Sequence, residues 1–323
     1  MIKLGIIGLG NVGLALHFPV LLARQDISIS WVSDVNLKYK KLVQNNKIKF
    51  FDNYKDALKT NSAEIILITT PYNSRSEIIE NINNKVVKGI YCEKPFALTL
   101  KEHENYVKNF DEHSFTIGYH RRSLGTVQTV KKIIDGNLFG KLLSVNIQFG
   151  SLHYNFDNFR SDKHIAGGGM LFEAGSHWID TVLYATSSTD IINFKAKKNF
   201  ANDLDISSSG EFIIKNDKFN DFKCKFVFSS FENLNNKIEF TFSNAKIELF
   251  LFEDGSDLIL SDNKLQKFTV SDFNFRNFPN DSLSIGTIYW EKFINSYKNK
   301  KINYTSQKNY KLTTKFIEMF YAK

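Results

Sequence analysis

A glycine-rich turn near the amino terminus constrains the fold of this chain more than any other feature. The segment Gly8-Leu9-Gly10-Asn11-Val12-Gly13 has the spacing G-x-G-x-x-G. It directly follows the apolar run Ile2–Gly8 and opens a helical pattern over Val12–Ala23. In this strand–turn–helix context the glycines permit a tight turn, close approach of backbone to a pyrophosphate, and close packing of helix on strand. The pattern therefore predicts a dinucleotide site that includes Gly8, Gly10, Asn11, Val12 and Gly13, with a functionless glycine-rich turn as the alternative.

The first third of the chain alternates short apolar runs with helical segments. Ile27–Ser33, Glu64–Thr69 and Val86–Cys92 are nearly continuous apolar runs of strand length. Such runs are typical of a parallel sheet that is covered on both faces. Pro19 lies inside the first helical pattern and predicts a kink or a shifted helix start. We predict an α/β fold that begins with a doubly wound Rossmann domain over residues 1–118.

The pattern changes after residue 118. A helix is predicted over Thr126–Asp135, and strands follow one another from about Ile191 to Val270 with apolar residues at every second position. Many of the 30 phenylalanines fall in this region, so one sheet face is expected to be buried and the other less so. Two helices close the chain, around Ile285–Tyr297 and Tyr310–Phe320. Residues 119–323 are therefore predicted to form a second domain, for substrate binding and oligomerisation.

Composition excludes several classes of protein. The two cysteines, Cys92 and Cys224, rule out a disulfide framework and multi-cysteine metal sites. No apolar run approaches the roughly 18 residues of a membrane span, and the amino terminus resembles a buried strand more than a signal peptide. The net charge of +8 is compatible with binding to nucleic acid, to an anionic surface or to an anionic ligand, and also with an effect on solubility alone. Since the basic residues are dispersed and no nucleic-acid motif is present, we expect a cytoplasmic protein with a small-molecule substrate and neither nucleic acid nor membrane as partner.

Asp34 bears on the choice of cofactor. It ends the second predicted strand, about 20 residues beyond Gly13. A carboxylate there accepts hydrogen bonds from an adenosine ribose and repels a 2′-phosphate. No arginine adjoins it, and Lys38 is the nearest following cation. The sequence favours NAD over NADP, with an ordinary solvated aspartate as the alternative.

The tripeptide Glu93-Lys94-Pro95 follows the fifth predicted strand. The carboxyl ends of parallel strands face the ligand crevice in folds of this kind. A lysine at this edge orients a substrate hydroxyl and stabilises a developing alkoxide. Pro95 fixes the local turn, and a cis peptide is one way to do so.

A second group of polar residues follows the glycines at 167–169. Glu173, His177 and Asp180 stand at i, i+4 and i+7, which in an α-helix places them within about 60° of one face. A carboxylate one turn before a histidine orients the ring for general acid–base work. A metal site ranks lower because no further histidine or cysteine ligand lies nearby, so we predict none. A histidine satisfied within its helix is the structural alternative.

Together these motifs resemble those of the Gfo/Idh/MocA oxidoreductases, and the resemblance covers most of the chain. It implies a Rossmann domain followed by an α/β domain with a large, mostly antiparallel sheet. It implies NAD(P)-linked oxidation of a sugar, nucleotide-sugar or inositol hydroxyl, with Lys94 as catalytic lysine and His177 as acid–base residue. The open face of the second sheet would form a homodimer or homotetramer, which the Phe-rich alternation suits. Expected cofactor contacts beyond the glycine-rich turn are Asp34, Thr70, Pro71, Glu93 and Lys94.

The chain departs from the family pattern at two positions. Glu173 stands where Asp is usual, so its role as partner of His177 is a hypothesis, and Arg75 stands where many members have His. A non-catalytic regulator that binds dinucleotide or sugar is therefore the alternative function, although Lys94 and His177 favour an enzyme. Arg122 could grip a carboxylate or phosphate, or belong to a solvated basic turn. The residues expected to contact substrate are His120, Arg122, Tyr154, His164 and Asp180.

Overall fold

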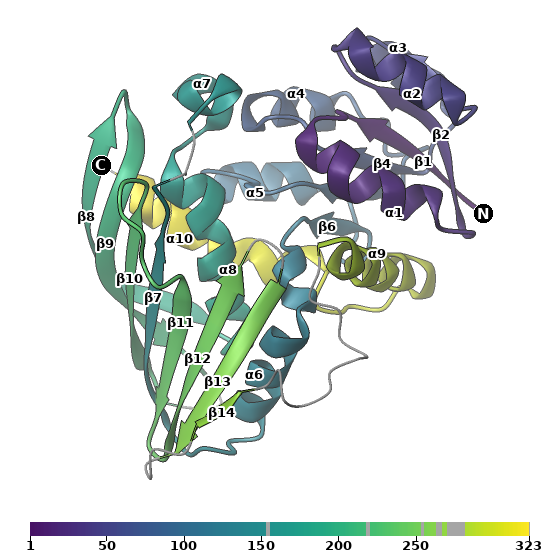
Figure 1. Ribbon diagram of the computed structural model, residues 1–323. Coiled ribbons are helices and arrows are strands. Elements are labelled where there is room, and N and C mark those ends of the chain that lie inside the picture. Colours follow the sequence, from purple (N-terminus) through teal and green to yellow (C-terminus); the bar gives the residue numbers. More distant parts are fainter. Residues whose placement is uncertain (153–155, 218–219, 253–254, 263–266, 270–281, 323) are drawn as a thin grey trace. The chain divides into compact units, whose positions relative to one another are not determined.

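The computed structural model describes the chain except residues 153–155, 218–219, 253–254, 263–266, 270–281 and 323 (Figure 1). The chain forms two compact units. The first comprises Met1–Ala97, Lys101–Gly118 and Gly286–Asn309, and the second comprises Leu98–Leu100, Tyr119–Ile285 and Tyr310–Lys323. The change of pattern near residue 118 thus marks a passage from the first unit to the second. The later return of Gly286–Asn309 to the first unit has no counterpart in the sequence patterns.

The first unit is built on a six-stranded parallel sheet with the order β3-β2-β1-β4-β5-β6. The order reverses between β1 and β4, as expected of a doubly wound Rossmann sheet. The strands are apolar and mostly buried, which agrees with the predicted cover on both faces. They are β1 (Ile2–Ile7), β2 (Ile27–Ser33), β3 (Lys49–Phe51), β4 (Ile65–Ile68), β5 (Gly89–Cys92) and β6 (Phe115–Ile117).

Helix α9 (Ser282–Asn299) contributes its larger part to the core of the first unit. Its residues Tyr289, Trp290 and Phe293 are fully buried and share one hydrophobic cluster with α1 and β1. The Tyr289 hydroxyl donates to the carbonyl of Ile117 at 2.5 Å, which ties α9 to β6. The other helical segments of this unit are η1 (Gly13–His17), α1 (Phe18–Leu22), η2 (Leu37–Tyr39), α2 (Lys40–Asn45), α3 (Tyr54–Lys59), η3 (Tyr72–Ser74), α4 (Arg75–Glu80), α5 (Leu100–Val107) and η8 (Gln307–Tyr310).

The first helix accommodates Pro19 by widening. Residues Gly13–His17 form a π-helical segment, and the α-helical Phe18–Leu22 follows with the proline in its first turn. A proline cannot donate the hydrogen bond of a continuous α-helix, and its ring crowds the preceding turn. The predicted irregularity at Pro19 is thus present as a π segment, and it ends at the buried His17.

The second unit contains an eight-stranded sheet with the order β14-β13-β12-β11-β7-β10-β9-β8. Neighbouring strands are antiparallel except for the parallel pair β7 and β10. The large, mostly antiparallel sheet implied by the family resemblance is therefore present. Its strands are β7 (Leu142–Gly150), β8 (Asp190–Ala201), β9 (Leu204–Lys215), β10 (Phe222–Ser229), β11 (Lys237–Phe242), β12 (Ala245–Phe252), β13 (Gly255–Asp262) and β14 (Lys267–Thr269).

Helices α6, α8 and α10 cover one face of this sheet (Figure 1). Phenylalanines of the alternating strands, such as Phe212 and Phe226, pack there against Phe316 of α10. The helical segments of this unit are η4 (His120–Ser123), α6 (Gly125–Asp135), η5 (Asn158–Ser161), α7 (Lys163–Ala166), η6 (Leu171–Gly175), α8 (Ser176–Ala185) and α10 (Lys311–Tyr321).

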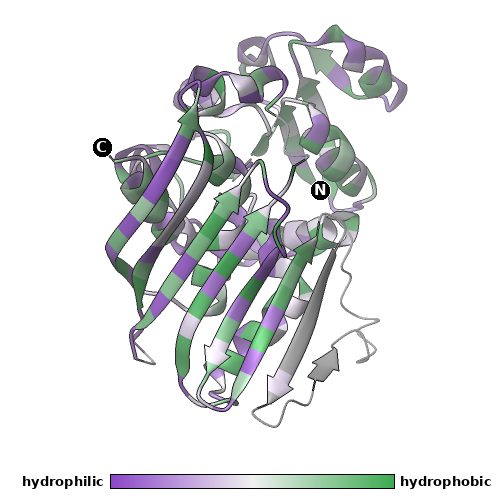
Figure 2. Cartoon of the chain, turned by 60° about the vertical axis from the view of Figure 1, so that its left-hand side comes forward, coloured by the Kyte–Doolittle hydropathy of each residue, from purple (hydrophilic) through white to green (hydrophobic). Residues whose placement is uncertain are grey.

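Hydrophilic and hydrophobic residues alternate along the strands of this sheet (Figure 2), and charged side chains pair across neighbouring strands. Lys237 pairs with Glu248, and Lys246 pairs with Glu239 at 2.7 Å. The Phe-rich alternation thus belongs to the helix-covered core. Assembly of a homodimer or homotetramer through the open face stays a prediction.

Candidate active site

The glycine-rich turn has the shape that a dinucleotide requires. Gly8 adopts a φ of +92°, which a residue with a side chain rarely adopts. Its amide donates to Ser33 at 2.8 Å, and its carbonyl accepts the Thr69 hydroxyl at 2.6 Å, so the turn is anchored to β2 and to the end of β4. A Cβ on Gly10 would meet no atom within 4 Å, so the backbone there faces open space. The turn therefore fits the pyrophosphate of a dinucleotide.

Asp34 is fastened to this turn. Its Oδ2 atom accepts the backbone N–H of Leu9 at 2.6 Å, and its Oδ1 atom accepts that of Asn36 at 2.7 Å. Each carboxylate oxygen has two lone pairs, so acceptor capacity remains for ribose hydroxyls. The carboxylate is half-buried and fixed in direction, which fits the ribose-binding role predicted for it.

The Glu93-Lys94-Pro95 turn follows β5, and the Lys94–Pro95 peptide bond is cis. The Glu93 carboxylate is buried; it lies 2.9 Å from Nε2 of His17 and accepts the N–H of Lys94 at 3.1 Å. Gly118 makes room for it, because a Cβ there would lie 2.3 Å from a carboxylate oxygen. The Glu93 side chain thus supports the turn from inside. From the sequence, Glu93 was predicted only as a cofactor contact.

Arg75 joins the ends of two strands. Its Nη2 atom donates to the carbonyl of Thr70 at 3.0 Å, and its guanidinium also donates to the carbonyls of Lys94 and Pro95. The side chain is buried. Arg75 therefore fixes the Thr70-Pro71 segment against the turn that carries Lys94.

In the second unit, His177 lies in the first turn of α8 within a group of aromatic rings. Its ring meets Tyr119 edge-on, with centroids 5.7 Å apart, and His120 at 5.3 Å. The side chain is 7% exposed. The structure thus brings His120 and His177 together, as two of the residues predicted for catalysis and substrate contact.

Glu173 does not follow the predicted helix geometry. Residues Leu171–Gly175 form a π-helical segment, so the rotation of 100° per residue that relates Glu173 to His177 in an α-helix does not hold. The Glu173 carboxylate accepts the Nε–H of Arg160 at 2.6 Å. The structure therefore supplies an arginine partner for Glu173, and its pairing with His177 stays a prediction.

Arg122 and Asp180 form a buried ion pair. The guanidinium donates to both carboxylate oxygens, at 2.7 and 2.6 Å, and Thr313 of α10 donates to Oδ1 at 2.8 Å. Both side chains are about 1% exposed. Burial raises the pKa of Asp180, and Arg122 and Thr313 oppose that rise. This arrangement argues against the substrate contacts expected of the two residues, because their charges and hydrogen-bonding groups are occupied within the unit.

Asp205, at the start of β9, is a residue that sequence reasoning missed. Its carboxylate is buried and accepts the N–H groups of Gly169 at 2.7 Å and Leu171 at 2.6 Å, together with the Tyr321 hydroxyl. It therefore holds the glycine-rich segment that leads into η6 and α8. No local signal marks it, since its partners lie 34 residues or more away in the sequence.

The remaining predicted contacts differ in exposure. Asn11 and Val12 are exposed at the glycine-rich turn, where a ligand can reach them. His164 is exposed in α7 (Lys163–Ala166), and its N–H donates to the side chain of Asp162. Tyr154 lies outside the described residues.

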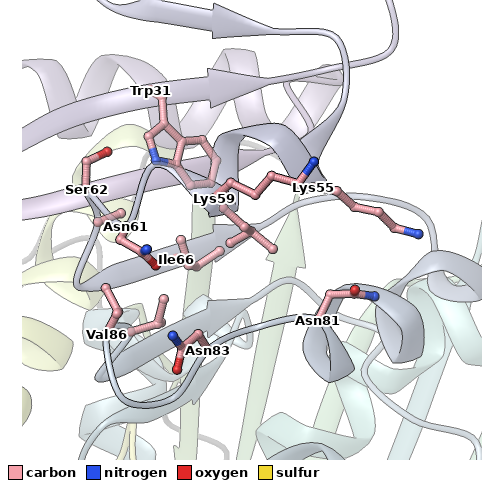
Figure 3. Close-up of a pocket in the computed structure, with 12 residues that line it drawn as sticks. Trp31, Lys55, Lys59, Asn61, Ser62, Ile66, Asn81, Asn83 and Val86 are labelled. Atoms are coloured by element: carbon pink, nitrogen blue, oxygen red, sulfur yellow. The ribbon is translucent and has the colours of Figure 1, made fainter.

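A pocket of about 330 Å³ lies in the first unit, and Figure 3 shows residues that line it. The loops that lead into β4 and β5 form much of its wall, and the lining includes the exposed Asn61 and Asn83 and the buried Trp31 and Ile66. The pocket therefore involves the amino ends of these strands, whereas the glycine-rich turn follows the carboxyl end of β1. Lys55 and Lys59 at its edge are paired with Glu77 and Asp56.

Two further features concern only the described part of the chain. No group of three His, Cys, Asp or Glu side chains gathers there as metal ligands. Nor does that part contain a helix with the length and apolarity needed to cross a bilayer.

The parallel sheet and its anchored turn define the first unit as a Rossmann domain for a dinucleotide. Family comparison narrows this class. The model of the oxidoreductase family with an NAD-binding Rossmann fold, GFO_IDH_MocA, matches residues 2–120, and the GFO/IDH/MocA C-terminal domain matches residues 127–248. The chain therefore belongs to the Gfo/Idh/MocA family and is an NAD(P)-dependent oxidoreductase.

Two curated relatives show the range of the family. Oxidoreductase P35 of Formosa agariphila is 26% identical over 67% of this chain and 70% of its own length. Glucose-6-phosphate 3-dehydrogenase of Bacillus subtilis is 28% identical over 62% of this chain and 58% of its own length.

Solved structures share the fold across nearly the whole chain. A levoglucosan dehydrogenase in complex with NADH and levoglucosan has a TM-score of 0.79 at 16% identity, over 98% of this chain and 95% of that one. A 3-ketoreductase from Actinomadura kijaniata, in complex with NADP and TDP-benzene, has a TM-score of 0.79 at 12% identity, over 98% and 96%. At such identities the likeness concerns the fold alone.

Proposed function

We propose that this protein transfers a hydride between NAD(H) and a CH–OH or ketone carbon of a sugar-like substrate. The observation that carries the proposal is the Glu93-Lys94-Pro95 turn, in which Glu93 and Arg75 hold the backbone of Lys94 from two sides. A lysine positioned in this way suits the stabilisation of charge on a reacting oxygen. The dehydrogenases of glucose 6-phosphate and levoglucosan among the similar proteins support a sugar as substrate class.

The cofactor preference rests on Asp34. Similar proteins have been solved with NADH and with NADP, so family membership leaves the choice open. The Asp34 carboxylate is fixed by two backbone N–H groups and keeps a negative charge where the 2′-phosphate of NADP would have to lie. NAD is therefore the proposed cofactor.

The chain's own residues supply positioning and proton transfer. The dinucleotide held by the glycine-rich turn and Asp34 would supply the acceptor, and in reverse the donor, of the hydride on the substrate carbon. Lys94 holds the substrate oxygen and stabilises its negative charge. His177 takes the hydroxyl proton, so that oxidation yields a ketone, one hydride on the cofactor and one proton on the imidazole. His120, Tyr154 and His164 remain the proposed substrate contacts.

The structure gives less support than the sequence did to a substrate that carries a phosphate or carboxylate. The sequence left open whether Arg122 grips a carboxylate or phosphate of the substrate. Because Arg122 is buried and bound to Asp180, we assign it no contact with a substrate phosphate. Uncharged sugars therefore belong in any substrate screen beside sugar phosphates and nucleotide sugars.

Two measurements test this function. Titration by protein fluorescence compares NAD with NADP, and absorbance of the reduced nicotinamide then follows turnover on free aldoses, polyols, sugar phosphates and nucleotide sugars. We expect tighter binding of NAD and turnover of at least one sugar. Binding of NAD without hydride transfer on any of them would instead support the alternative, a non-catalytic regulator on the same fold.

A further inference from the structure

A buried chain of hydrogen bonds in the first unit ends at the turn that carries Lys94. The indole Nε1 of Trp290 lies 3.0 Å from Nδ1 of His17, and Nε2 of His17 lies 2.9 Å from Oε1 of Glu93. The other carboxylate oxygen accepts the N–H of Lys94. His17 and Trp290 are 0% exposed and Glu93 is 4% exposed. The function proposed above uses neither His17 nor Trp290.

The chemistry of the partners determines the protonation of His17. An indole nitrogen only donates, so Nδ1 of the histidine must accept. The proton of the neutral ring then sits on Nε2 and is donated to the Glu93 carboxylate. A doubly protonated imidazole would donate from both nitrogens and lose the bond from Trp290. The ring is therefore held in its neutral Nε2–H form, and Glu93 is held as a carboxylate that accepts on both oxygens.

Packing leaves these side chains little freedom. Tyr91 meets the His17 ring edge-on at 4.9 Å and stacks on Trp290 at 4.5 Å. The carboxylate of Glu93 fills the space left by Gly118. His17 is also the last residue of η1, the segment that follows the glycine-rich turn. The chain of bonds thus joins the dinucleotide-binding turn, helix α9 and the Lys94 turn within one unit.

We propose that His17 and Trp290 are positioning residues for Lys94. Trp290 fixes the tautomer of His17, His17 fixes the Glu93 carboxylate, and that carboxylate fixes the backbone of Lys94. A displaced catalytic group loses rate even when its chemistry is unchanged. The effect on Lys94 rests on the proposed function, whereas the tautomer of His17 does not.

The tautomer is tested first, by NMR of protein labelled with ¹⁵N-histidine. The His17 signals are assigned as those missing from the His17→Gln variant. We expect the Nε2–H pattern of a neutral ring at neutral pH. In Trp290→Phe, which keeps an aromatic ring but lacks the donor, the ring should exchange between its two tautomers. An Nδ1–H pattern in the unaltered protein would overturn the proposal.

The effect on Lys94 is tested by three variants, on whichever sugar the screen identifies. His17→Leu removes the donor to Glu93 and should lower kcat roughly 100-fold while the Kd for NAD stays close to that of the unaltered protein. His17→Gln restores an N–H for Glu93 and should recover most of the rate. Leu21→Ala truncates a buried residue of the adjoining α1 and controls for lost stability.

The outcomes distinguish a role of His17 in positioning Lys94 from a role in the stability of the fold alone. A kcat that falls equally in Leu21→Ala and His17→Leu, or that fails to recover in His17→Gln, would overturn the positioning role. If the unaltered protein turns over no sugar, the proposed function fails, but the NMR result still decides whether Trp290 and His17 hold the Glu93 carboxylate.

Discussion

The backbone N–H of Leu9 donates to Oδ2 of Asp34 across 2.6 Å, so the carboxylate at the end of β2 is fastened to the glycine-rich turn. The two features that the sequence assigns to one cofactor are thereby a single structural element. The direction of the carboxylate follows from this bond and from the second one, to Asn36. Both the affinity and the choice of dinucleotide should therefore depend on Asp34.

Asp34→Ala should weaken NAD binding about tenfold or more, because a hydrogen bond to a charged group is lost. It should also narrow the difference between NAD and NADP, because the negative charge near the 2′-position is removed. Fluorescence titration with both dinucleotides measures these effects, and Asp56→Asn at an exposed site serves as control. Tighter binding of NADP than NAD by the unaltered protein would contradict the assignment.

Arg122→Met should destabilise the second unit by about 3–5 kcal/mol, because it leaves the Asp180 carboxylate buried without its cation. Removing both charges, in Arg122→Met with Asp180→Leu, should cost clearly less. Urea unfolding followed by circular dichroism gives the free energies. The exposed pair of Lys223 and Glu211 provides the control, and Lys223→Met should change stability by less than about 1 kcal/mol. If Arg122→Met and the control variant lowered the free energy of unfolding equally, the result would count against a stabilising role of the buried pair.

Asp205→Asn should lower the free energy of unfolding by about 1–3 kcal/mol, because the new amide N–H₂ group faces a backbone N–H that needs an acceptor. Hydrogen exchange should quicken at Gly169 and Leu171, whose amides Asp205 binds. Tyr321→Phe removes one donor and leaves those two amides bound, so its exchange pattern should stay close to that of the unaltered protein. Unchanged exchange in Asp205→Asn would show that the carboxylate does not hold this segment.

The stability of the first unit should depend on pH through Asp26. Burial opposes the shift, but bonds from Arg24 and from Lys298 of α9 lower the pKa of Asp26 to about 2, from 3.8. A lowered pKa in the folded state stabilises the fold above the unfolded pKa, and the contribution is lost as pH falls from 3.8 toward 2. Because the side chain is 34% exposed, solvent screens the pairs, and Asp26→Asn should cost at most about 1 kcal/mol at neutral pH. Unfolding free energies measured from pH 7 downward should converge for the two proteins, and a constant difference would contradict this account.

The sequence predicted the features whose signal is local. The Rossmann domain follows from the glycine spacing and from apolar runs such as Glu64–Thr69, because burial of a whole strand is visible along the chain. The alternating strands of the second sheet were predicted for the same reason. The two π segments were not, since a widened helix at Gly13–His17 or Leu171–Gly175 depends on surrounding packing as well as on local residues.

Pairings between distant residues were beyond local patterns. Arg122 and Asp180 are 58 positions apart, and Trp290 lies 273 positions beyond His17. Periodicity shows that such residues face a core, but it does not identify the residues that they contact there. For this reason Arg122 and Asp180 were assigned to the substrate, the carbonyls that Arg75 binds were not predicted, and His17 and Asp205 were assigned no role.

The proposed role of Lys94 is to act on the substrate oxygen in hydride transfer. It is tested most directly by single-turnover stopped-flow absorbance of NADH formation with Lys94→Met and with Lys88→Met, an exposed control. We predict that, at saturating NAD, Lys94→Met slows hydride transfer by about 100- to 1,000-fold, the usual cost of removing one donor to a developing oxyanion, while Lys88→Met keeps the rate of the unaltered protein. A rate for Lys94→Met close to that of the unaltered protein would contradict the account.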